Sequence, residues 1–548
     1  MNFLLTRHLA LALLLTLCNA AMAADFAPIS KPKLIVLLVV DGLPQRQVLA
    51  YRDQLSNDGL ARFLDRGAWF SQAHYGHAYT VTAPGHATLL TGATPSSTGI
   101  IGNEWRDPNI GEAQYCMADV SATYIGHKTY ALDGTSPKNL RVQTVGDVLR
   151  RAYPGAKVIS VSGKDRAAIL LAGKTGTAYI YMASDGAFAS STYYMAQHPR
   201  WVTEFNARRE ANRYFNSEWK PLLPESAYGR SLPDGQKWFP LGGGKLPMLF
   251  GAHDDAPGPR FYSDLLRSPF GDAMTLDFAR AAIAGEALGQ RDVPDILAIS
   301  LSGHDYVNHA FSAESRISHD HLLQLDRLLQ GFFRDLDAAV GQENYIAVLS
   351  ADHGFMPAPE YSATLGRDAG RLNPALLLGL LNQGLEKRFG VGQWALHFSG
   401  PGMQLNKRLI AQKGLDLDLV SDAARSLMLA APGVAVAYTR RELEDGSRAG
   451  APFFEAMQKS FSRDVPVDLA FVLKPWWMLG SGASGSTHGS PYPTDTQVPL
   501  LFYGPRWIRP GRIDTRVDMI DLAPTLAQHL GVSAPPAAHG QPLPLLAP

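Results

Sequence analysis

Cysteine is nearly absent from this chain. Only Cys18 and Cys116 occur among 548 residues, and Cys18 lies in an N-terminal segment that we expect to be removed. Cys116 would then be the only cysteine of the mature chain, which excludes an internal disulfide. We expect this residue to be a small thiol that is buried or partly buried.

A net charge of either sign is also missing. The 50 Lys and Arg residues balance 50 Asp and Glu residues, and no clustered block of basic residues occurs. Proteins that bind the phosphate backbone of nucleic acids carry a clustered positive excess, so we expect no nucleic-acid partner. With 46% hydrophobic and 18% charged residues, the composition is typical of a soluble globular protein.

Long hydrophobic runs are missing from the body of the chain. Near the N-terminus, Arg7 precedes an apolar run at 9–17, and a small-x-small site follows at 21–23. This pattern predicts a secretory signal peptide, residues 1–23, cleaved after Ala23. The run is too short to span a bilayer comfortably. We therefore expect an exported bacterial protein, periplasmic or secreted, with no membrane span in the mature chain.

Several apolar runs elsewhere predict buried strands that end in polar residues. They lie at 33–40, 156–162, 295–301, 345–349 and 498–503. Their two faces are equally apolar, as in parallel strands covered on both sides. Helical patterns at 139–152 and 318–336 lie between them. This alternation predicts an α/β fold, with a doubly wound, mostly parallel central sheet and helices on both faces.

Two long segments interrupt the alternation of strands and helices. We interpret residues 24–548 as a single catalytic domain with cap insertions at about 171–290 and 361–485. The second insertion contains Trp476 and Trp477, and both core packing and a place at the entrance of the site stay open for them. The sequence does not define the oligomeric state, and a monomer is plausible.

The predicted strand ends carry ionisable residues suited to binding metal ions. Ligands of doubly wound sheets bind outside the carboxyl ends of the strands. Taken alone, each cluster is also compatible with an ordinary ion pair or loop. Together they supply three carboxylates and three imidazoles, enough for two cations with nitrogen and oxygen donors, and zinc fits this set. The candidates are Asp41, Asp305, His309, Asp352, His353 and His488.

Two adjacent metal ions form a clamp suited to in-line displacement at phosphorus. Such a site also needs a nucleophile and donors for the phosphate oxygens. Thr82, in the stretch Thr-Ala-Pro-Gly-His at 82–86, offers a hydroxyl, although this stretch alone is more typical of an ordinary turn. Asn103, Lys164 and Arg166 offer donors, and the guanidinium suits bidentate phosphate contact.

These motifs together resemble a known family. They are Val-Val-Asp-Gly (39–42), Thr-Ala-Pro-Gly-His (82–86), Gly-Asn-Glu-Trp (102–105), Lys-Asp-Arg (164–166), Asp-Tyr-Val-Asn-His (305–309), Ala-Asp-His-Gly (351–354) and Thr-His-Gly-Ser (487–490). In order and spacing the chain resembles the alkaline phosphatase superfamily. Within it, the chain is similar to the phosphate-irrepressible (PafA-like) bacterial alkaline phosphatases, which use a threonine nucleophile.

The resemblance implies roles for the candidate residues. One Zn²⁺ would be held by Asp305, His309 and His488. A second Zn²⁺ would be held by the remaining three ligands (Asp41, Asp352 and His353), with the oxygen of Thr82 as a further ligand. Asn103, Lys164 and Arg166 would hold the non-bridging phosphate oxygens. The implied activity is hydrolysis of phosphate monoesters to alcohol and inorganic phosphate through a phosphothreonine intermediate.

Other functions remain as alternatives at this point. Zinc phosphodiesterases and nucleotide pyrophosphatases of the same superfamily share the threonine, the asparagine and the six ligands, but they lack the Lys164-x-Arg166 pair. A catalytically inactive binding protein with a structural zinc or calcium site is an alternative from another class. Sulfatases need a Cys/Ser-x-Pro-x-Arg motif, which the surroundings of Cys116 do not provide.

Overall fold

The computed structural model describes residues 31–107, 111–240, 244–399, 402–482 and 484–545. Residues from Pro32 onward form one compact unit. The predicted signal peptide and its cleavage site after Ala23 lie outside the described residues, so both stay predictions. Within the described part of the chain, every helix is too short or too polar to cross a membrane.

A nine-stranded sheet forms the centre of the molecule, in the order β20-β2-β19-β12-β1-β11-β6-β7-β8. Its middle is parallel: β1 (Leu34–Val40) pairs with both β11 (Asp295–Leu301) and β12 (Tyr345–Ser350). The parallel part continues through β6 (Val158–Ser162) to β7 (Thr177–Met182). Every residue of β1, β11 and β12 is buried, because helices cover both faces of the sheet. The predicted α/β, mostly parallel fold is thus confirmed.

One reversed strand flanks the parallel part on each side. On one side β8 (Ala187–Ala189) pairs with β7, and on the other β19 (Leu500–Tyr503) runs antiparallel to β12. The strands β2 (Ala68–Phe70) and β20 (Gly511–Ile513) follow β19. Four of the five predicted strand runs therefore lie in the parallel part, and the last, β19, lies antiparallel beside it.

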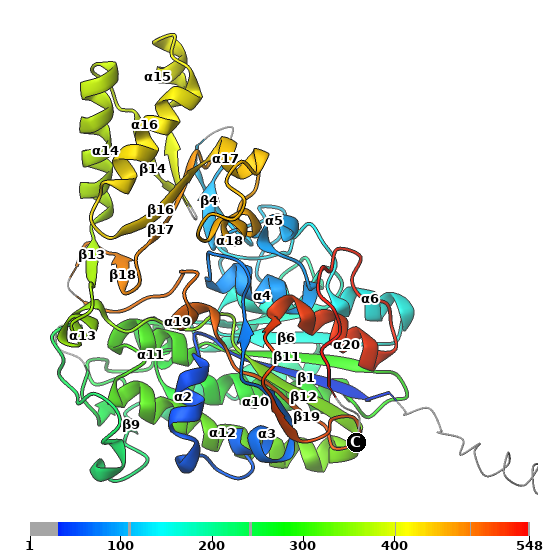
Figure 1. The fold of residues 1–548 in the computed structure, drawn as a ribbon. Helices are drawn as coiled ribbons and strands as arrows, with labels where there is room; N and C mark the ends of the chain where they lie inside the picture. The colour runs from blue at the N-terminus through cyan, green and yellow to red at the C-terminus, as the bar shows by residue number, and fades with distance from the viewer. Residues whose placement is uncertain (1–30, 108–110, 241–243, 400–401, 483, 546–548) are drawn as a thin grey trace, which may run out of the picture. The chain divides into compact units, whose positions relative to one another are not determined.

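Helices pack on both faces of the central sheet (Figure 1). One layer contains α4 (Thr82–Thr91), α6 (Val145–Ala152), α7 (Asp165–Ala172) and α20 (Leu522–Leu530), which contact one another. The other contains α10 (Pro269–Glu286) and α12 (Arg316–Val340), packed side by side. The helix predicted at 318–336 corresponds to α12, and the one at 139–152 is realised only from Val145 onward.

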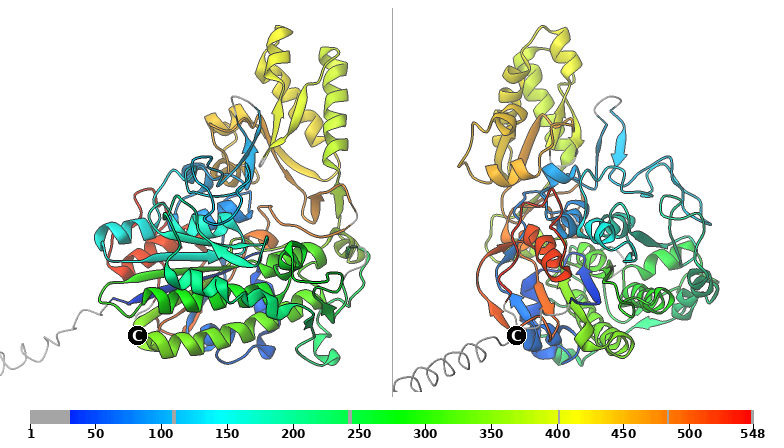
Figure 2. Two further views of the ribbon diagram at one scale, coloured as in Figure 1. Left: turned by 180° about the vertical axis from the view of Figure 1, so that it is seen from behind. Right: turned by 90° about the vertical axis from the view of Figure 1, so that its right-hand side faces the viewer.

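The two predicted insertion regions differ in structure. Residues 171–290 include β7 and β8 at the edge of the sheet and α10 on its face. Residues 361–485 build a separate four-stranded antiparallel sheet, β14 (Ala395–Ser399), β15 (Gly402–Leu405), β17 (Leu469–Leu473) and β16 (Val434–Thr439), in that order. The helices α14 (Pro374–Phe389) and α16 (Leu417–Leu429) pack with this sheet around a second hydrophobic core (Figure 2).

Candidate active site

Helix α4 begins at Thr82 and is held against the end of β12. Val81, before it, is extended, and Pro84 lies in the first turn, where its missing N–H leaves no intrahelical bond unmade. A Cβ atom on Gly85 would lie 2.1 Å from the Asp352 carbonyl oxygen, so only glycine allows this approach. The His86 Nδ1 lies 2.9 Å from the Thr82 carbonyl oxygen and 3.2 Å from Asp352 Oδ2. These contacts fix the position of Thr82.

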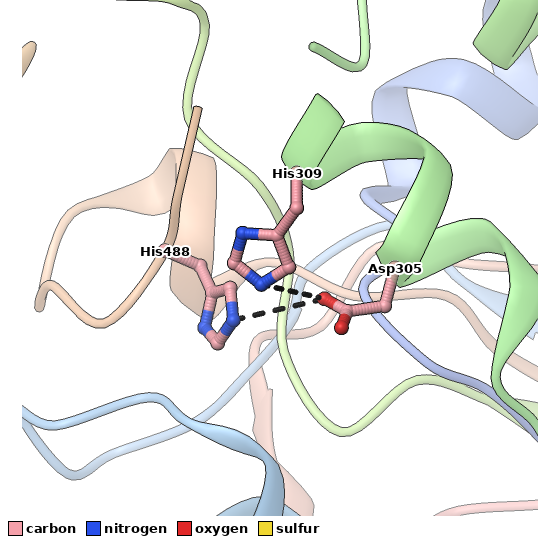
Figure 3. Close-up of side chains that lie close together, drawn as sticks. All are labelled: Asp305, His309 and His488. Carbon is pink, nitrogen blue, oxygen red and sulfur yellow. Dashed lines mark ion pairs between the residues drawn. The ribbon is translucent and has the colours of Figure 1, made fainter. Parts of the chain in front are cut away.

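The first candidate metal group combines Asp305, His309 and His488 (Figure 3). Asp305 and His309 lie one turn apart on α11 (Gly303–Phe311), as their spacing predicts, and His488 lies in the loop between β18 (Trp477–Leu479) and α19 (Pro493–Thr496). The Asp305 Oδ1 is 3.5 Å from His309 Nε2 and 3.7 Å from His488 Nε2. One ligand atom from each residue lies within 4.8 Å of the others.

Backbone carbonyls orient both imidazoles of this group. His309 Nδ1 donates to the Ser486 carbonyl oxygen and His488 Nδ1 to the Thr80 carbonyl oxygen, each at 2.9 Å. A histidine that donates through Nδ1 presents the lone pair of Nε2, the arrangement typical of metal ligands. Burial lowers the pKa of His488 well below its usual value, which keeps that lone pair free of a proton.

The second candidate metal group combines Asp41, Asp352 and His353, all fully buried. Asp41 follows β1, and the other two follow β12, so neighbouring parallel strands deliver all three ligands. His353 Nδ1 donates to the Gly354 carbonyl oxygen at 2.9 Å. Its Nε2 lies 3.5 Å from Asp41 Oδ1 and 3.3 Å from Asp352 Oδ2. Both candidate groups contain the residues that the resemblance implies.

The donor atoms of both groups fit cations. Several of these atoms are buried and have no hydrogen-bond partner, among them Asp41 Oδ1, Asp305 Oδ1, Asp352 Oδ2 and His353 Nε2. Unpaired buried oxygens of carboxylates are costly unless they coordinate a cation. Burial and the Asp352 carboxylate raise the pKa of Asp41 well above its usual value, which is a consequence of crowded negative charge. A bound divalent ion would relieve that crowding.

Lys164 and Arg166 take different places in the structure. The Lys164 Nζ lies 2.7 Å from Asp41 Oδ2 and 2.5 Å from Asp305 Oδ2, so it contacts one carboxylate from each metal group. Although burial opposes its charge, Asp305 and Asp41 raise the pKa of Lys164 above its usual value. Arg166 Nη2 instead faces the Thr82 hydroxyl at 3.5 Å.

Asn103 also lies beside the first turn of α4. Its Oδ1 accepts a hydrogen bond from the Ala83 N–H at 2.9 Å, which leaves its NH₂ group as a donor. The structure therefore brings Asn103 and Arg166 together around Thr82, whereas Lys164 is withdrawn between carboxylates.

Sequence reasoning missed several residues that position this site. Tyr115, on β5 (Ala113–Tyr115), donates to the Asp165 Oδ1, and its hydroxyl oxygen accepts from Arg166 Nη1 at 3.3 Å. Asp165 also accepts from the Gly134 N–H at 2.7 Å. The Tyr306 ring faces the Lys164 ammonium at 5.0 Å. Tyr306 lies inside the 305–309 motif and could have been noticed, but no local pattern singles out Tyr115.

The isolated thiol is confirmed as structural. Cys116 is free and buried, and burial raises the pKa of its thiol well above the usual range. The side chain packs in a small hydrophobic core with Ala83, Ala87 and Ile169. The Cys116 side chain therefore packs against α4, and its buried thiol is not suited to act as a nucleophile.

The chain is similar to several known proteins over most of its length. A family model described as type I phosphodiesterase / nucleotide pyrophosphatase matches residues 35–425. Alkaline phosphatase PafA of Elizabethkingia meningoseptica is 32% identical over 519 residues, 94% of each chain. A protein of Myroides odoratus named calcium-transporting ATPase is 33% identical over 522 residues, also 94% of each chain. Alkaline phosphatase PhoV of Synechococcus elongatus is 33% identical over 528 residues, 94% of this chain and 92% of that one.

A solved structure extends the likeness to the whole fold. The crystal structure of wild-type alkaline phosphatase PafA superimposes with a TM-score of 0.87 at 31% identity, covering 94% of this chain and 99% of that chain. A chain this similar over nearly its full length belongs to the alkaline phosphatase superfamily. Within that superfamily it is a PafA-like alkaline phosphatase.

Proposed function

We propose that this chain is an exported, zinc-dependent phosphomonoesterase that works through a phosphothreonine intermediate. The observation that carries the proposal is the position of the Thr82 hydroxyl. It lies at the fixed start of α4, within 3.5 Å of the Arg166 guanidinium, on a helix locked to Asp352 of the second metal group. A structural metal site or a binding protein would not need a hydroxyl held in this place.

Each side chain has a definite part in the proposed reaction. Asp305, His309 and His488 would hold one Zn²⁺, and the other three ligands together with Thr82 Oγ1 would hold a second. When bound, such ions supply electrophilic stabilisation of the attacking and leaving oxygens. Arg166 and the Asn103 NH₂ group orient the phosphoryl group opposite Thr82, where charge spreads over the non-bridging oxygens.

The proposed chemistry proceeds in two displacements at phosphorus. In the first, Thr82 Oγ1 loses its proton to solvent and forms a bond to phosphorus, while the bond to the alcohol oxygen breaks. The alcohol leaves after taking up a proton from solvent. In the second, a water oxygen attacks the phosphothreonine, so that inorganic phosphate leaves and the Thr82 hydroxyl is restored.

Lys164 and Arg166 favour monoesters over diesters as substrates. A monoester dianion carries one more negative charge than a diester, and these two cations would balance that extra charge. A phosphodiesterase or nucleotide pyrophosphatase activity is the second candidate, since the matching family model carries that description. The pair of cations is the feature that supports the monoesterase proposal against it.

Steady-state kinetics with metal analysis test this proposal. We expect the zinc-loaded protein to hydrolyse p-nitrophenyl phosphate with a much larger kcat/KM than bis(p-nitrophenyl) phosphate. EDTA should abolish turnover, and added Zn²⁺ should restore it. A higher kcat/KM for the diester would favour the second candidate, and no turnover of either ester by protein with two bound ions would contradict both.

Export and assembly are part of the proposal. We expect the mature protein in the periplasm or the medium, beginning at Ala24, and a monomer in solution. Cell fractionation followed by N-terminal sequencing tests the first point, and light scattering tests the second. Recovery of full-length chain only from the cytoplasm would contradict the predicted export.

A further inference from the structure

A cavity of about 250 Å³ lies between the second sheet and the loop that carries His488. Its walls come from several elements of the insertion region 361–485 and from the loop before α4. The apolar lining includes Phe398, Met457, Phe461, Phe471 and Met478. Trp477 also lines it, whereas Trp476 faces the Arg367 guanidinium at 4.7 Å.

The cavity shares walls with the first metal group. Thr487, His488 and Gly489 line it, and so does Tyr79, three residues before the nucleophile. The hydrogen bond from His488 Nδ1 to the Thr80 carbonyl oxygen ties these two walls together. Lys164 and Arg166 are not among its lining residues. The cavity therefore borders the first metal group and the loop before Thr82 and is lined by neither cation, as expected of a site for the alcohol part of a substrate.

The chemistry of the lining selects an apolar ligand. Among the described residues that line the cavity, none is a lysine or arginine, and the one acid is Asp495, whose buried Oδ1 has no hydrogen-bond partner. Its Oδ2 accepts from the Ser490 N–H at 2.9 Å and from the Ser490 hydroxyl at 2.6 Å. No lysine or arginine is therefore available to pair with a second phosphate, and the few hydroxyl groups (Tyr79, Ser460, Thr487 and Ser490) lie in a mostly apolar lining. The thioethers of Met457 and Met478 are flexible and adapt to ligands of different shape.

We propose that this cavity is the leaving-group subsite and that the enzyme prefers phosphate monoesters of apolar alcohols, with an aryl ring or an alkyl chain of about six carbons. Its size supports this, because apolar cavities of about 150 Å³ already accommodate a benzene ring. The inference rests on the proposed monoesterase function. It adds the chemical class of the alcohol, which the metal groups and the phosphate-facing residues leave undefined.

A homologous series of n-alkyl phosphates from ethyl to hexyl tests the subsite. The leaving alcohols in this series differ little in acidity, so reactivity stays nearly constant while apolar surface increases. We expect kcat/KM of the zinc-loaded enzyme to increase at least about tenfold from ethyl to hexyl phosphate. Phe471→Ser should reduce this ratio to about threefold or less, because kcat/KM for hexyl phosphate should decrease more than kcat/KM for ethyl phosphate.

A matched control separates the cavity from general effects on the second sheet. Phe389→Ser removes another partly buried aromatic ring from the same region, one that does not line the cavity, and it should keep the chain-length dependence. Phe471→Leu should keep most of it. If Phe471→Ser does not fold, Met457→Gln polarises the cavity from α18 (Phe454–Lys459) instead. An equal ratio in the parent and in a folded Phe471→Ser or Met457→Gln protein would overturn the proposal.

Binding of n-alkylphosphonates distinguishes failure of the subsite from failure of the proposed function. These compounds cannot be hydrolysed, and their dissociation constants are measured by calorimetry. A Kd that decreases about tenfold or more from ethyl to hexylphosphonate, and does not do so in Phe471→Ser, supports the subsite even if no monoester is turned over. Hydrolysis of ethyl phosphate with no dependence of either kcat/KM or Kd on chain length leaves the monoesterase intact and refutes the subsite.

Discussion

Replacing Gly85 by alanine should displace the helix that carries Thr82, while every proposed ligand keeps its chemical identity. The new Cβ would lie 2.1 Å from the Asp352 carbonyl oxygen and 2.9 Å from the Asp352 Cβ, whereas ordinary van der Waals contact begins at 3.4 Å. Helix α4 and the end of β12 would therefore have to separate by about 1 Å. Because the obstructing atom belongs to the backbone of a buried strand end, no side-chain rotation relieves the clash.

The expected loss is large in catalysis and moderate in stability. A displacement of about 1 Å between reacting groups costs about a hundredfold in rate, and overpacking a buried contact costs about 1–3 kcal/mol. We expect kcat/KM for p-nitrophenyl phosphate to decrease about a hundredfold in Gly85→Ala. The assay combines steady-state kinetics, the zinc content of the same sample and the unfolding midpoint in urea.

Gly331→Ala is the matched control for this substitution. Gly331 lies inside α12, where the nearest atom to a new Cβ is Arg280 Nη2 at 3.5 Å, so the alanine fits and activity should be unchanged. Glycine in a helix is less favourable than alanine by about 0.5–1 kcal/mol, so this variant should unfold at a slightly higher urea concentration than the parent. Parental kcat/KM in a folded Gly85→Ala protein would refute the argument that Gly85 sets the position of the nucleophile.

Three further predictions concern the residues around the site. Thr82→Ala should abolish most turnover while two zinc ions still bind, as measured by metal analysis; undiminished phosphatase activity would exclude Thr82 as the nucleophile. Lys164→Ala combined with Arg166→Ala should reduce kcat/KM for a monoester far more than for a diester, and equal losses would mean that these cations do not recognise the extra monoester charge. Burial raises the folded-state pKa of Asp272 to about 7, so the stability that its protonated form contributes is fully present below the usual pKa of 3.8 and is lost as pH rises to about 7. Asp272→Asn mimics the protonated form. The free energy of unfolding of the variant minus that of the parent should therefore increase by on the order of 1–4 kcal/mol from pH 4 to pH 8. Urea titrations that show the same difference at both pH values would contradict this pKa.

The centre of the sheet could be predicted from the sequence because it is buried on both faces. The run at 295–301 coincides with β11, and the runs at 33–40 and 345–349 differ from β1 and β12 by a single residue at one end. The antiparallel direction of β19 could not be predicted, because an apolar run of this length is compatible with either direction. The short edge strands β2, β8 and β20 have three residues each and no periodic signal.

The candidate metal ligands could be predicted for a similar reason. Neighbouring parallel strands end at the same edge of a sheet. Once 33–40 and 345–349 are predicted as such strands, Asp41 and the pair Asp352-His353 are expected to lie close together, as they do after β1 and β12. The second sheet and its cavity could not be predicted, because their walls come from positions as distant as Tyr79 and Met478. Contacts between side chains so far apart in sequence leave no local pattern.

The separate places of Lys164 and Arg166 follow from a helix boundary that falls between them. Lys164 is extended and precedes α7, whereas Arg166 is in the first turn of that helix, so the two side chains leave the backbone in different directions. Lys164 uses the Oδ2 atoms of Asp41 and Asp305, while the Oδ1 atoms of both carboxylates stay without hydrogen bonds. Each carboxylate can therefore contact the Lys164 ammonium through one oxygen and coordinate a metal cation through the other. An ammonium has three N–H donors, so two carboxylate contacts leave one for a phosphate oxygen. In the proposed reaction Lys164 would thus connect recognition of the monoester charge to both candidate metal groups, a role that an exposed lysine could not fill.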